Sequence, residues 1–180
     1  TVTVITPTTG TPERRDYLHD LRHSLDHQGV SWRWVIALDG RTAPLPSSIV
    51  NDQRVTVVTT GANRRGAAAA RNLALTRVRT QWVTSVDDDD LLADDSLLLR
   101  VNAALSRLGL GWSCGRMVDL LPGGETTQRC SLLPTEDMTH QQRLVPSGPV
   151  DPGGPWRAWP ESRAPFPLSP SALMVRTSLL

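Results

Sequence analysis

Short apolar runs alternate along the chain with segments of helical spacing, and this alternation is the main guide to the fold. The runs are rich in β-branched residues and too short for independent helices, which favours strands. We expect the first strand to end at Pro7, because proline has no N–H to donate to a neighbouring strand. The predicted strands cover residues 1–6, 32–38, 54–59, 82–86, 111–118 and 171–177.

Three longer segments between these runs have the apolar spacing of helices. In the first, Leu18, Leu21 and Leu25 recur at intervals typical of one buried helix face. Thr11 is its expected N-cap, and Gly29 is expected to end it. The predicted helices cover residues 12–28, residues 64–78, and a segment that Asp94 or Asp95 caps and that ends near Leu108.

Strands and helices that alternate in this way predict an α/β domain with a mostly parallel, Rossmann-like sheet and helices on both faces. Residues 41–49 are expected to be a surface connection. The composition changes beyond residue 118, because 10 of the 14 prolines lie between Leu121 and Pro170. We expect that stretch to be a mobile segment that closes over a bound ligand.

Composition excludes several classes of function. The net charge is +1, which does not indicate a nucleic-acid partner or an anionic membrane surface. No apolar run approaches the roughly 18 residues of a transmembrane segment. Cys114 and Cys130 lack the spacing of metal ligands; a disulfide stays open, but we expect a reduced, cytoplasmic protein.

Three histidines of the first helix, His19, His23 and His27, share one face at intervals of four residues. Such spacing can bind a metal ion. The alternative is a polar, solvated helix face beside Asp16 and Asp20. We favour the solvated face, because the sequence supplies no closed set of ligands there.

Four consecutive aspartates, Asp87 to Asp90, follow directly on the strand at residues 82–86. Ionised carboxylates cannot be buried without partners, so they must face water or a cation. Ligands of open α/β sheets bind at the carboxyl ends of the strands, and Mg²⁺ prefers oxygen ligands together with substrate phosphates. One hypothesis is therefore a metal–diphosphate site; the alternative is a solvated acidic turn that leads into a helix.

Four segments, taken together, resemble family 2 glycosyltransferases, and their order and spacing match through about residue 118. The second segment departs from the family's Asp-Asp-Gly, because Leu38 stands in place of the first aspartate and only Asp39 remains. The segments are Thr3–Pro7, an opening strand that ends in proline; Val35–Gly40; Gly66–Asn72, a Gly-x-x-x-Ala-Arg-Asn helix; and Asp87–Asp90, an Asp-x-Asp-Asp signature.

The resemblance implies the GT-A fold and a metal-dependent transfer of sugar from a nucleotide-sugar donor to an acceptor hydroxyl, with inversion. Mn²⁺ or Mg²⁺ is the implied cofactor. It implies that Thr6 and Pro7 line the nucleotide pocket through their backbone. It also implies that Asp39 accepts an N–H of the base and that Arg71 reaches the nucleotide or its phosphates. The alternatives are a turn residue before Gly40 for Asp39 and a structural salt bridge to one of the aspartates for Arg71.

The same resemblance assigns roles within the aspartates. It implies that Asp87 contacts the ribose and the metal region, and that Asp89 is the main metal ligand. Asp90 ranks third, acting through water or only as a cap. Asp88 occupies the variable position, so its charge has no implied role.

No general base is assignable from the sequence, since none of the later acidic residues matches the context of the family's base. Residues 1–118 are expected to be the nucleotide-sugar-binding region, and residues 119–180 an acceptor-side region of the same domain, apparently truncated. A non-catalytic nucleotide-sugar-binding fragment, a sugar-phosphate nucleotidyltransferase and a retaining mechanism stay open as alternatives. The acidic residues considered for the base are Glu136, Asp137, Asp151 and Glu161.

Overall fold

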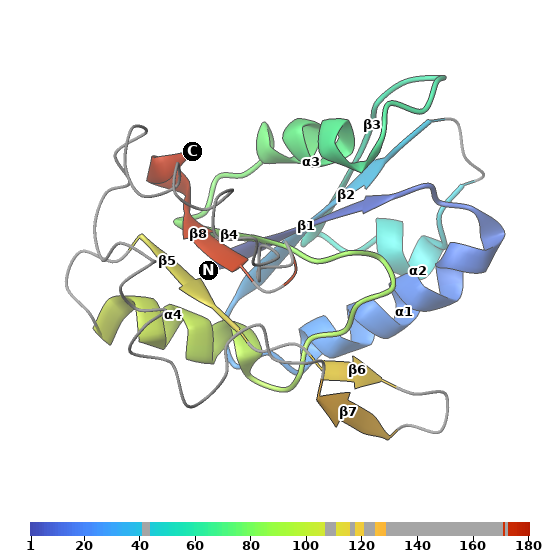
Figure 1. Cartoon of the computed structure of the whole chain (residues 1–180). Coiled ribbons are helices and arrows are strands. Elements are labelled where there is room, and N and C mark those ends of the chain that lie inside the picture. The colour runs from blue at the N-terminus through green and yellow to red at the C-terminus, as the bar shows by residue number, and fades with distance from the viewer. Residues whose placement is uncertain (41–43, 107–110, 116–117, 121–124, 129–170, 172) are drawn as a thin grey trace, which may run out of the picture.

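The computed structural model describes residues 1–40, 44–106, 111–115, 118–120, 125–128, 171 and 173–180. Within these residues, the main feature is a six-stranded sheet (Figure 1). The strand order is β3 (Val55–Thr59), β2 (Trp32–Leu38), β1 (Val2–Thr8), β4 (Trp82–Ser85), β8 (Leu173–Arg176) and β5 (Trp112–Cys114).

The sheet is mostly parallel, as the alternation of elements predicts. β3, β2, β1 and β4 run in the same direction, whereas β8 lies antiparallel between β4 and β5. The last strand of the chain therefore belongs to the same sheet as the first. A separate antiparallel ribbon joins β6 (Val118–Leu120) and β7 (Thr126–Gln128), away from the sheet in Figure 1.

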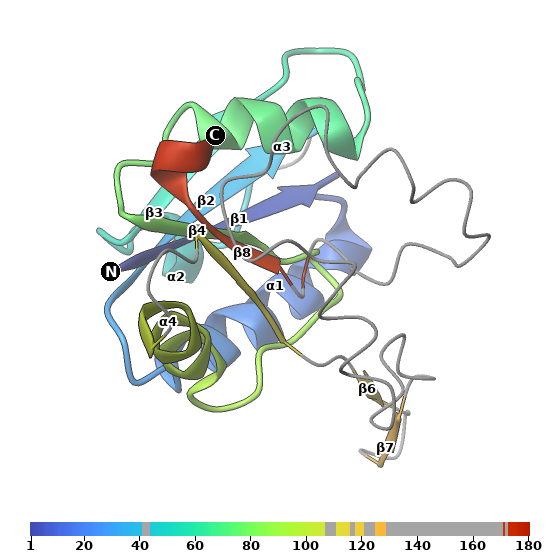
Figure 2. The same cartoon turned by 60° about the vertical axis from the view of Figure 1, so that its left-hand side comes forward.

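Helices cover both faces of the sheet, which confirms the predicted α/β architecture. α1 (Pro12–Asp26), α2 (Ser47–Val50) and α4 (Ser96–Ser106) lie on one face, and α3 (Ala67–Leu75) lies on the other (Figures 1 and 2). Among the described residues, no helix is long and apolar enough to cross a bilayer.

The larger core lies between the sheet and α1. The predicted stripe of Leu18, Leu21 and Leu25 is fully buried and packs in one cluster with Trp34 and Trp82. Burying a leucine side chain contributes about 1.5–3 kcal/mol, so this stripe is a main source of stability. It fixes α1, and with it the first turn of α1, against the strands.

The opposite face has a thinner core. Ala70 and Ala74 of α3 are fully buried against Ile5, Val35 and Val83. Alanine side chains let the helix axis approach the sheet closely, because they add little volume between them. α3 is shorter than the predicted helix at residues 64–78, since it begins only after Gly66, whose φ is +88°.

The prediction that Pro7 ends the first strand is wrong, because β1 continues to Thr8. Ile5 accepts a hydrogen bond from Val86 on the β4 side, whereas Thr8 accepts one from Asp39 on the β2 side. Backbone groups alternate sides along a strand, so the nitrogen of Pro7 faces the β4 side. The pairing of β1 with β4 ends at Ile5, and the missing N–H therefore breaks no ladder bond.

Other element boundaries differ from the sequence predictions by a few residues, and one short helix was not predicted. The connection at residues 41–49 runs into the one-turn helix α2, which is too short to show a period. The predicted strand at residues 111–118 is shorter, since β5 ends at Cys114 and β6 starts at Val118. Thr11 is the N-cap residue of α1, but its side chain makes no capping hydrogen bond.

Gln28 joins the end of α1 to the start of α4. Its buried amide donates to the carbonyl oxygens of Ser24 and Ala93 at 2.9 and 3.0 Å, and its Oε1 accepts from the Leu97 N–H at 2.9 Å. One of the N–H groups that a helix start leaves unpaired is thereby satisfied by a side chain from another helix. Asp95, one of the two predicted caps, directly precedes α4 and accepts from the Leu99 N–H through its carbonyl at 2.9 Å, while its carboxylate accepts from the Gly29 N–H at 2.8 Å.

We expect Gln28→Ala to lower the free energy of unfolding by about 1–3 kcal/mol, because it leaves buried backbone groups without partners. Urea unfolding followed by circular dichroism measures the change. Gln53→Ala, at an exposed position, is the matched control and should stay within about 0.5 kcal/mol of wild type. Equal stability of the two variants would show that Gln28 does not hold α1 to α4.

Candidate functional site

The four parallel strands end at the same edge of the sheet, and a pocket opens there at the ends of β1, β2 and β4. After β1 the chain builds β2 and β3 on one side and returns to β4 on the other, so β1 and β4 flank a topological switch point. Ligands of open α/β sheets bind in the crevice at such a point. The pocket has a volume of about 260 Å³ and is lined by Pro7, Thr8, Thr9, Arg14, Asp39, Ala67, Arg71, Asp87, Asp88 and Asp89.

Asp87 stands where β4 leaves the sheet and is held from two directions. Its carboxylate accepts a hydrogen bond from Nη2 of Arg71 at 2.5 Å, and Nε of Arg71 donates to the Ser85 hydroxyl at 3.1 Å. The Asp87 N–H donates to the hydroxyl of Ser171 at 3.2 Å, and Ser171 is in turn bound through its carbonyl by the buried Arg100. The chain just before β8 therefore helps to position this aspartate.

Asp88 is the buried member of the acidic run. Its carboxylate accepts from the Thr8 hydroxyl at 2.5 Å and from Nη1 of Arg14 at 2.9 Å. Burial raises the pKa of the Asp88 carboxyl, although Thr8 and Arg14 both favour its charged form. The sequence gives position 88 no role, whereas the structure makes it the anchor of Arg14.

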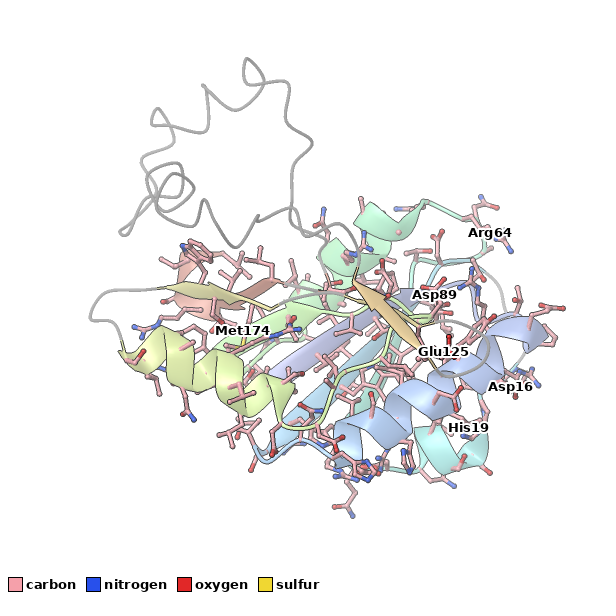
Figure 3. All side chains as sticks on the ribbon, turned by 60° about the horizontal axis from the view of Figure 1, so that its bottom comes forward. Asp16, His19, Arg64, Asp89, Glu125 and Met174 are labelled. Atoms are coloured by element: carbon pink, nitrogen blue, oxygen red, sulfur yellow. The ribbon has the colours of Figure 1, made fainter. Side chains whose placement is uncertain are left out.

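Asp89 is the exposed member, with 53 % of its side chain accessible against 10 % for Asp88. Its carboxylate accepts from the same Arg14 nitrogen at 2.8 Å. Figure 3 shows Asp89 at the strand ends, with Arg64 on the segment that leads to α3. The Asp90 N–H closes a turn onto the Asp87 carbonyl at 3.1 Å, and Asp90 is not among the residues that line the pocket.

The alternative interpretation, an acidic turn that leads into a helix, is confirmed only in part. The aspartates do form a turn, but α4 begins at Ser96, beyond the turn. The three carboxylates of the run that line the pocket, Asp87, Asp88 and Asp89, all accept hydrogen bonds from arginines. The run is therefore more than a solvated surface loop.

Asp39 lines the pocket from the end of β2 and also organises the start of α3. Its carboxylate accepts from the N–H groups of Arg65 and Gly66 at 2.7 and 2.9 Å and from the Thr60 hydroxyl at 3.1 Å. These bonds, that of the Arg65 N–H foremost, lower the pKa of the Asp39 carboxyl. α3 and its Arg71 are thus fixed relative to β2 by this carboxylate.

Pro7 lines the pocket, as the sequence predicts, but Thr6 lies in the core. The side chain of Thr6 is fully buried, and its Oγ1 accepts from Nε1 of Trp34 at 2.9 Å. The sequence-predicted residues that the pocket brings together are therefore Pro7, Asp39, Arg71, Asp87 and Asp89.

The donor set fits a divalent cation that is shared with a ligand better than a closed metal cage. Among the described residues, no group of three His, Cys, Asp or Glu side chains is arranged to hold a metal ion. Asp87 and Asp89 nevertheless face one pocket, and Mg²⁺ is usually bound through one or two carboxylates plus substrate phosphates.

The histidines of the first helix do not line this pocket, and several other sequence candidates lie outside the described residues. His19, His23 and His27 lie on the exposed face of α1, as the solvated alternative predicts. Figure 3 shows Asp16 and His19 along that helix. Cys130, the four acidic residues considered for the general base, and most of the Leu121–Pro170 stretch lie outside the described residues.

The chain belongs to glycosyl transferase family 2, whose match covers residues 3–149. It is 35 % identical over 111 residues to the Bacillus subtilis (strain 168) protein described as "Putative teichuronic acid biosynthesis glycosyltransferase TuaG". That match covers 59 % of this chain and 42 % of the relative. The chain therefore spans less than half the length of this curated relative.

Solved structures with the same fold include residues 1–349 of TarS from S. aureus, with a TM-score of 0.56 at 22 % identity. That match covers 99 % of this chain and 48 % of the TarS chain. The mannosyltransferase PcManGT from Pyrobaculum calidifontis matches with a TM-score of 0.50 at 23 % identity, over 64 % of this chain and 35 % of its own. These likenesses confirm the predicted GT-A type of fold.

We expect Asp39→Asn to lower the melting temperature at pH 7, because an amide nitrogen cannot accept the bonds that the carboxylate accepts. The pKa of the Asp39 carboxyl is lower in the folded state than its value of 3.8 in the unfolded chain. Such a carboxyl stabilises the fold at any pH above 3.8, and this stabilisation is lost as the pH falls through the pKa of the folded state. The gap between wild type and variant should therefore be widest near neutral pH and shrink below pH 3.8.

Melting curves recorded from pH 3 to pH 7 measure this gap. Asp20→Asn, on the exposed face of α1, is the matched control and should have the same melting temperature as wild type at pH 7. A gap that stays constant, or widens, toward acid pH would contradict the role given to the Asp39 carboxylate.

Proposed function

We propose that this chain binds a nucleoside diphosphate sugar in the pocket at the ends of β1, β2 and β4 and serves sugar transfer to an acceptor hydroxyl. The observation that carries the proposal is the charge pattern of that pocket. Carboxylates of Asp87 and Asp89 face the same space as guanidinium groups, at the switch point of the sheet. Membership of glycosyl transferase family 2 favours sugar transfer over the nucleotidyltransferase alternative.

The proposal includes a divalent cation, Mn²⁺ or Mg²⁺. Asp89 would be its main protein ligand because it is the most exposed aspartate of the pocket, Asp87 would be the second, and Asp90 a third through water. Bound there, the cation would offset the negative charge that grows on the departing diphosphate. The PcManGT structure was solved with GDP-Man and Mn²⁺, which supports this cation for a protein of the same fold.

The protein's own groups supply the rest of donor binding in this proposal. Arg71 is oriented by Ser85 and Asp87, so its planar, permanently charged group is placed for the phosphates. Within the described residues, Oδ2 of Asp39 accepts from the Gly66 N–H alone, and that oxygen has capacity for an N–H of the base. Pro7 would border the base, and Thr6 would contribute only as the buried support behind it.

Nucleotide sugars are the donor class that the structural neighbours support. TarS structures were solved with UDP and with UDP-GlcNAc, and PcManGT with GDP-Man. We extend to this chain only the shared chemistry, a nucleoside diphosphate joined to a sugar. Both UDP and GDP are therefore probes for the pocket.

We further propose that residues 1–118 carry the donor site and residues 119–180 the acceptor side, with inversion at the anomeric carbon. The aspartates and arginines of the pocket all lie before residue 118, which supports the first part. An inverting transfer needs a base near the acceptor hydroxyl, and the anomeric configuration of the product, read by NMR, tests the stereochemistry.

We expect UDP or GDP to raise the melting temperature of the chain only when Mn²⁺ or Mg²⁺ is present, because a ligand of the folded state stabilises it by mass action. Asp89→Asn should weaken nucleotide binding in Mn²⁺ by about tenfold or more, since a charge-assisted contact is lost. The same change should alter the free energy of unfolding without ligand by at most about 1 kcal/mol, because the Arg14–Asp89 pair is exposed.

Isothermal titration calorimetry with each nucleotide, in Mn²⁺ and in EDTA, measures these effects. Asp94→Asn removes an exposed carboxylate outside the pocket and is the matched control. Equal nucleotide binding in Mn²⁺ and in EDTA would remove the cation from the proposal, and no binding in either would overturn the donor site.

A further inference from the structure

Arg14 is a cation of the pocket to which neither the sequence motifs nor the family resemblance gives a role. It lies in the first turn of α1, on the face of the sheet opposite to α3 and Arg71. The pocket aspartates are thus flanked by one guanidinium from each side of the sheet.

The two carboxylates that share Arg14 are not equivalent. Nη1 of Arg14 donates to Asp88 at 2.9 Å and to Asp89 at 2.8 Å. Asp88 is buried and is also fixed by the Thr8 hydroxyl, so it holds the arginine in place. Asp89 is exposed, and exposed ion pairs exchange partners at little cost in free energy.

The same Asp89 carboxylate is the proposed main ligand of the cation, so Arg14 and a cation compete for it. A guanidinium that loses Asp89 but keeps Asp88 remains at the pocket wall with N–H donors to offer. Phosphate oxygens suit those donors, because the planar fork of arginine matches the geometry of a phosphate group.

We propose that Arg14 is a donor-binding residue that holds Asp89 while the pocket is empty and hydrogen-bonds the donor's diphosphate once Asp89 turns to the cation. Asp88 and Thr8 are the fixed support that keeps Arg14 in reach of both partners. This inference rests on the proposed function, since it needs a nucleoside diphosphate and a divalent cation in the same pocket.

The role predicts effects of opposite sign on two ligands, which a merely structural arginine would not produce. Arg14→Gln should bind Mn²⁺ alone about twofold to fivefold more tightly, because a competing exposed ion pair is gone. In saturating Mn²⁺ it should bind UDP or GDP about tenfold to hundredfold more weakly, because one hydrogen bond between charged groups is lost.

Electron paramagnetic resonance of free Mn²⁺ measures the first affinity on the whole chain, and calorimetry with UDP and GDP measures the second. Arg15→Gln removes the same charge from the next residue of α1, which does not line the pocket, and should change each affinity by about twofold at most. Arg14→Lys keeps the charge without the planar fork and should bind nucleotide with an affinity between wild type and Arg14→Gln. Arg14→Met repeats the test if the melting curve shows that Arg14→Gln is unfolded.

Opposite shifts for the two ligands support the inference. In the folded Arg14 variants, an unchanged nucleotide affinity would overturn the inference, and so would weaker binding of both Mn²⁺ and nucleotide. If the wild-type protein binds nucleotide in Mn²⁺, the proposed function would stand in either case. Wild-type protein that binds neither UDP nor GDP in Mn²⁺ would overturn the proposed function, and this inference with it.

Discussion

The pairing of β1 with a neighbour on each side decides where the acidic run of the pocket lies. Thr8 pairs with Leu38 on β2, whereas the pairing with β4 stops earlier, at Ile5 and Ser85. β4 therefore leaves the sheet before β1 does, and its next residues turn across the end of β1. This difference in length brings Asp88 to the Thr8 hydroxyl and opens the crevice beside it.

Charge compensation explains the arrangement around that crevice. Adjacent carboxylates repel, and a partly buried one needs a partner to stay ionised. α1 supplies Arg14 from one face of the sheet, and α3 supplies Arg71 from the other. Each helix is itself fixed near the site, α1 by its leucine stripe and α3 by the bonds that Asp39 makes to the segment before it. The pocket is thus held together by the same packing that holds the sheet.

Most of the fold follows from patterns that are local in sequence. β-branched runs predict the main strands, and the interval between Leu18, Leu21 and Leu25 predicts the buried face of α1. The sequence wrongly ends the first strand at Pro7. Whether a proline breaks a ladder hydrogen bond depends on which strand lies on its nitrogen side and on how far that strand extends, and neither can be read from the local sequence. α2 is missed because one turn of helix shows no period.

The sequence predicted Pro7, Arg71 and three of the four aspartates of the pocket, Asp39, Asp87 and Asp89, but not Asp88 or Arg14. A strand that ends in carboxylates indicates a ligand edge from sequence alone, and the family motifs add Asp39 and Arg71. The pair of Arg14 with Asp88 is separated by 74 residues, and it depends on how α1 is rotated against the sheet. The leucine spacing predicts which face of α1 is buried but not which residues of β1 and β4 its first turn meets, so the anchoring role of Asp88 and the position of Arg14 emerge only from the packed structure.

A crystal structure of the chain with UDP and Mn²⁺, with anomalous scattering used to locate the manganese, would show whether Asp89 and the diphosphate share the cation. We expect a single manganese peak between the Asp89 carboxylate and the diphosphate, with Asp87 beside it and Arg14 turned from Asp89 to a phosphate oxygen. Manganese elsewhere, for instance on the His19, His23 and His27 face of α1, or a diphosphate bound away from the ends of β1 and β4, would contradict this expectation.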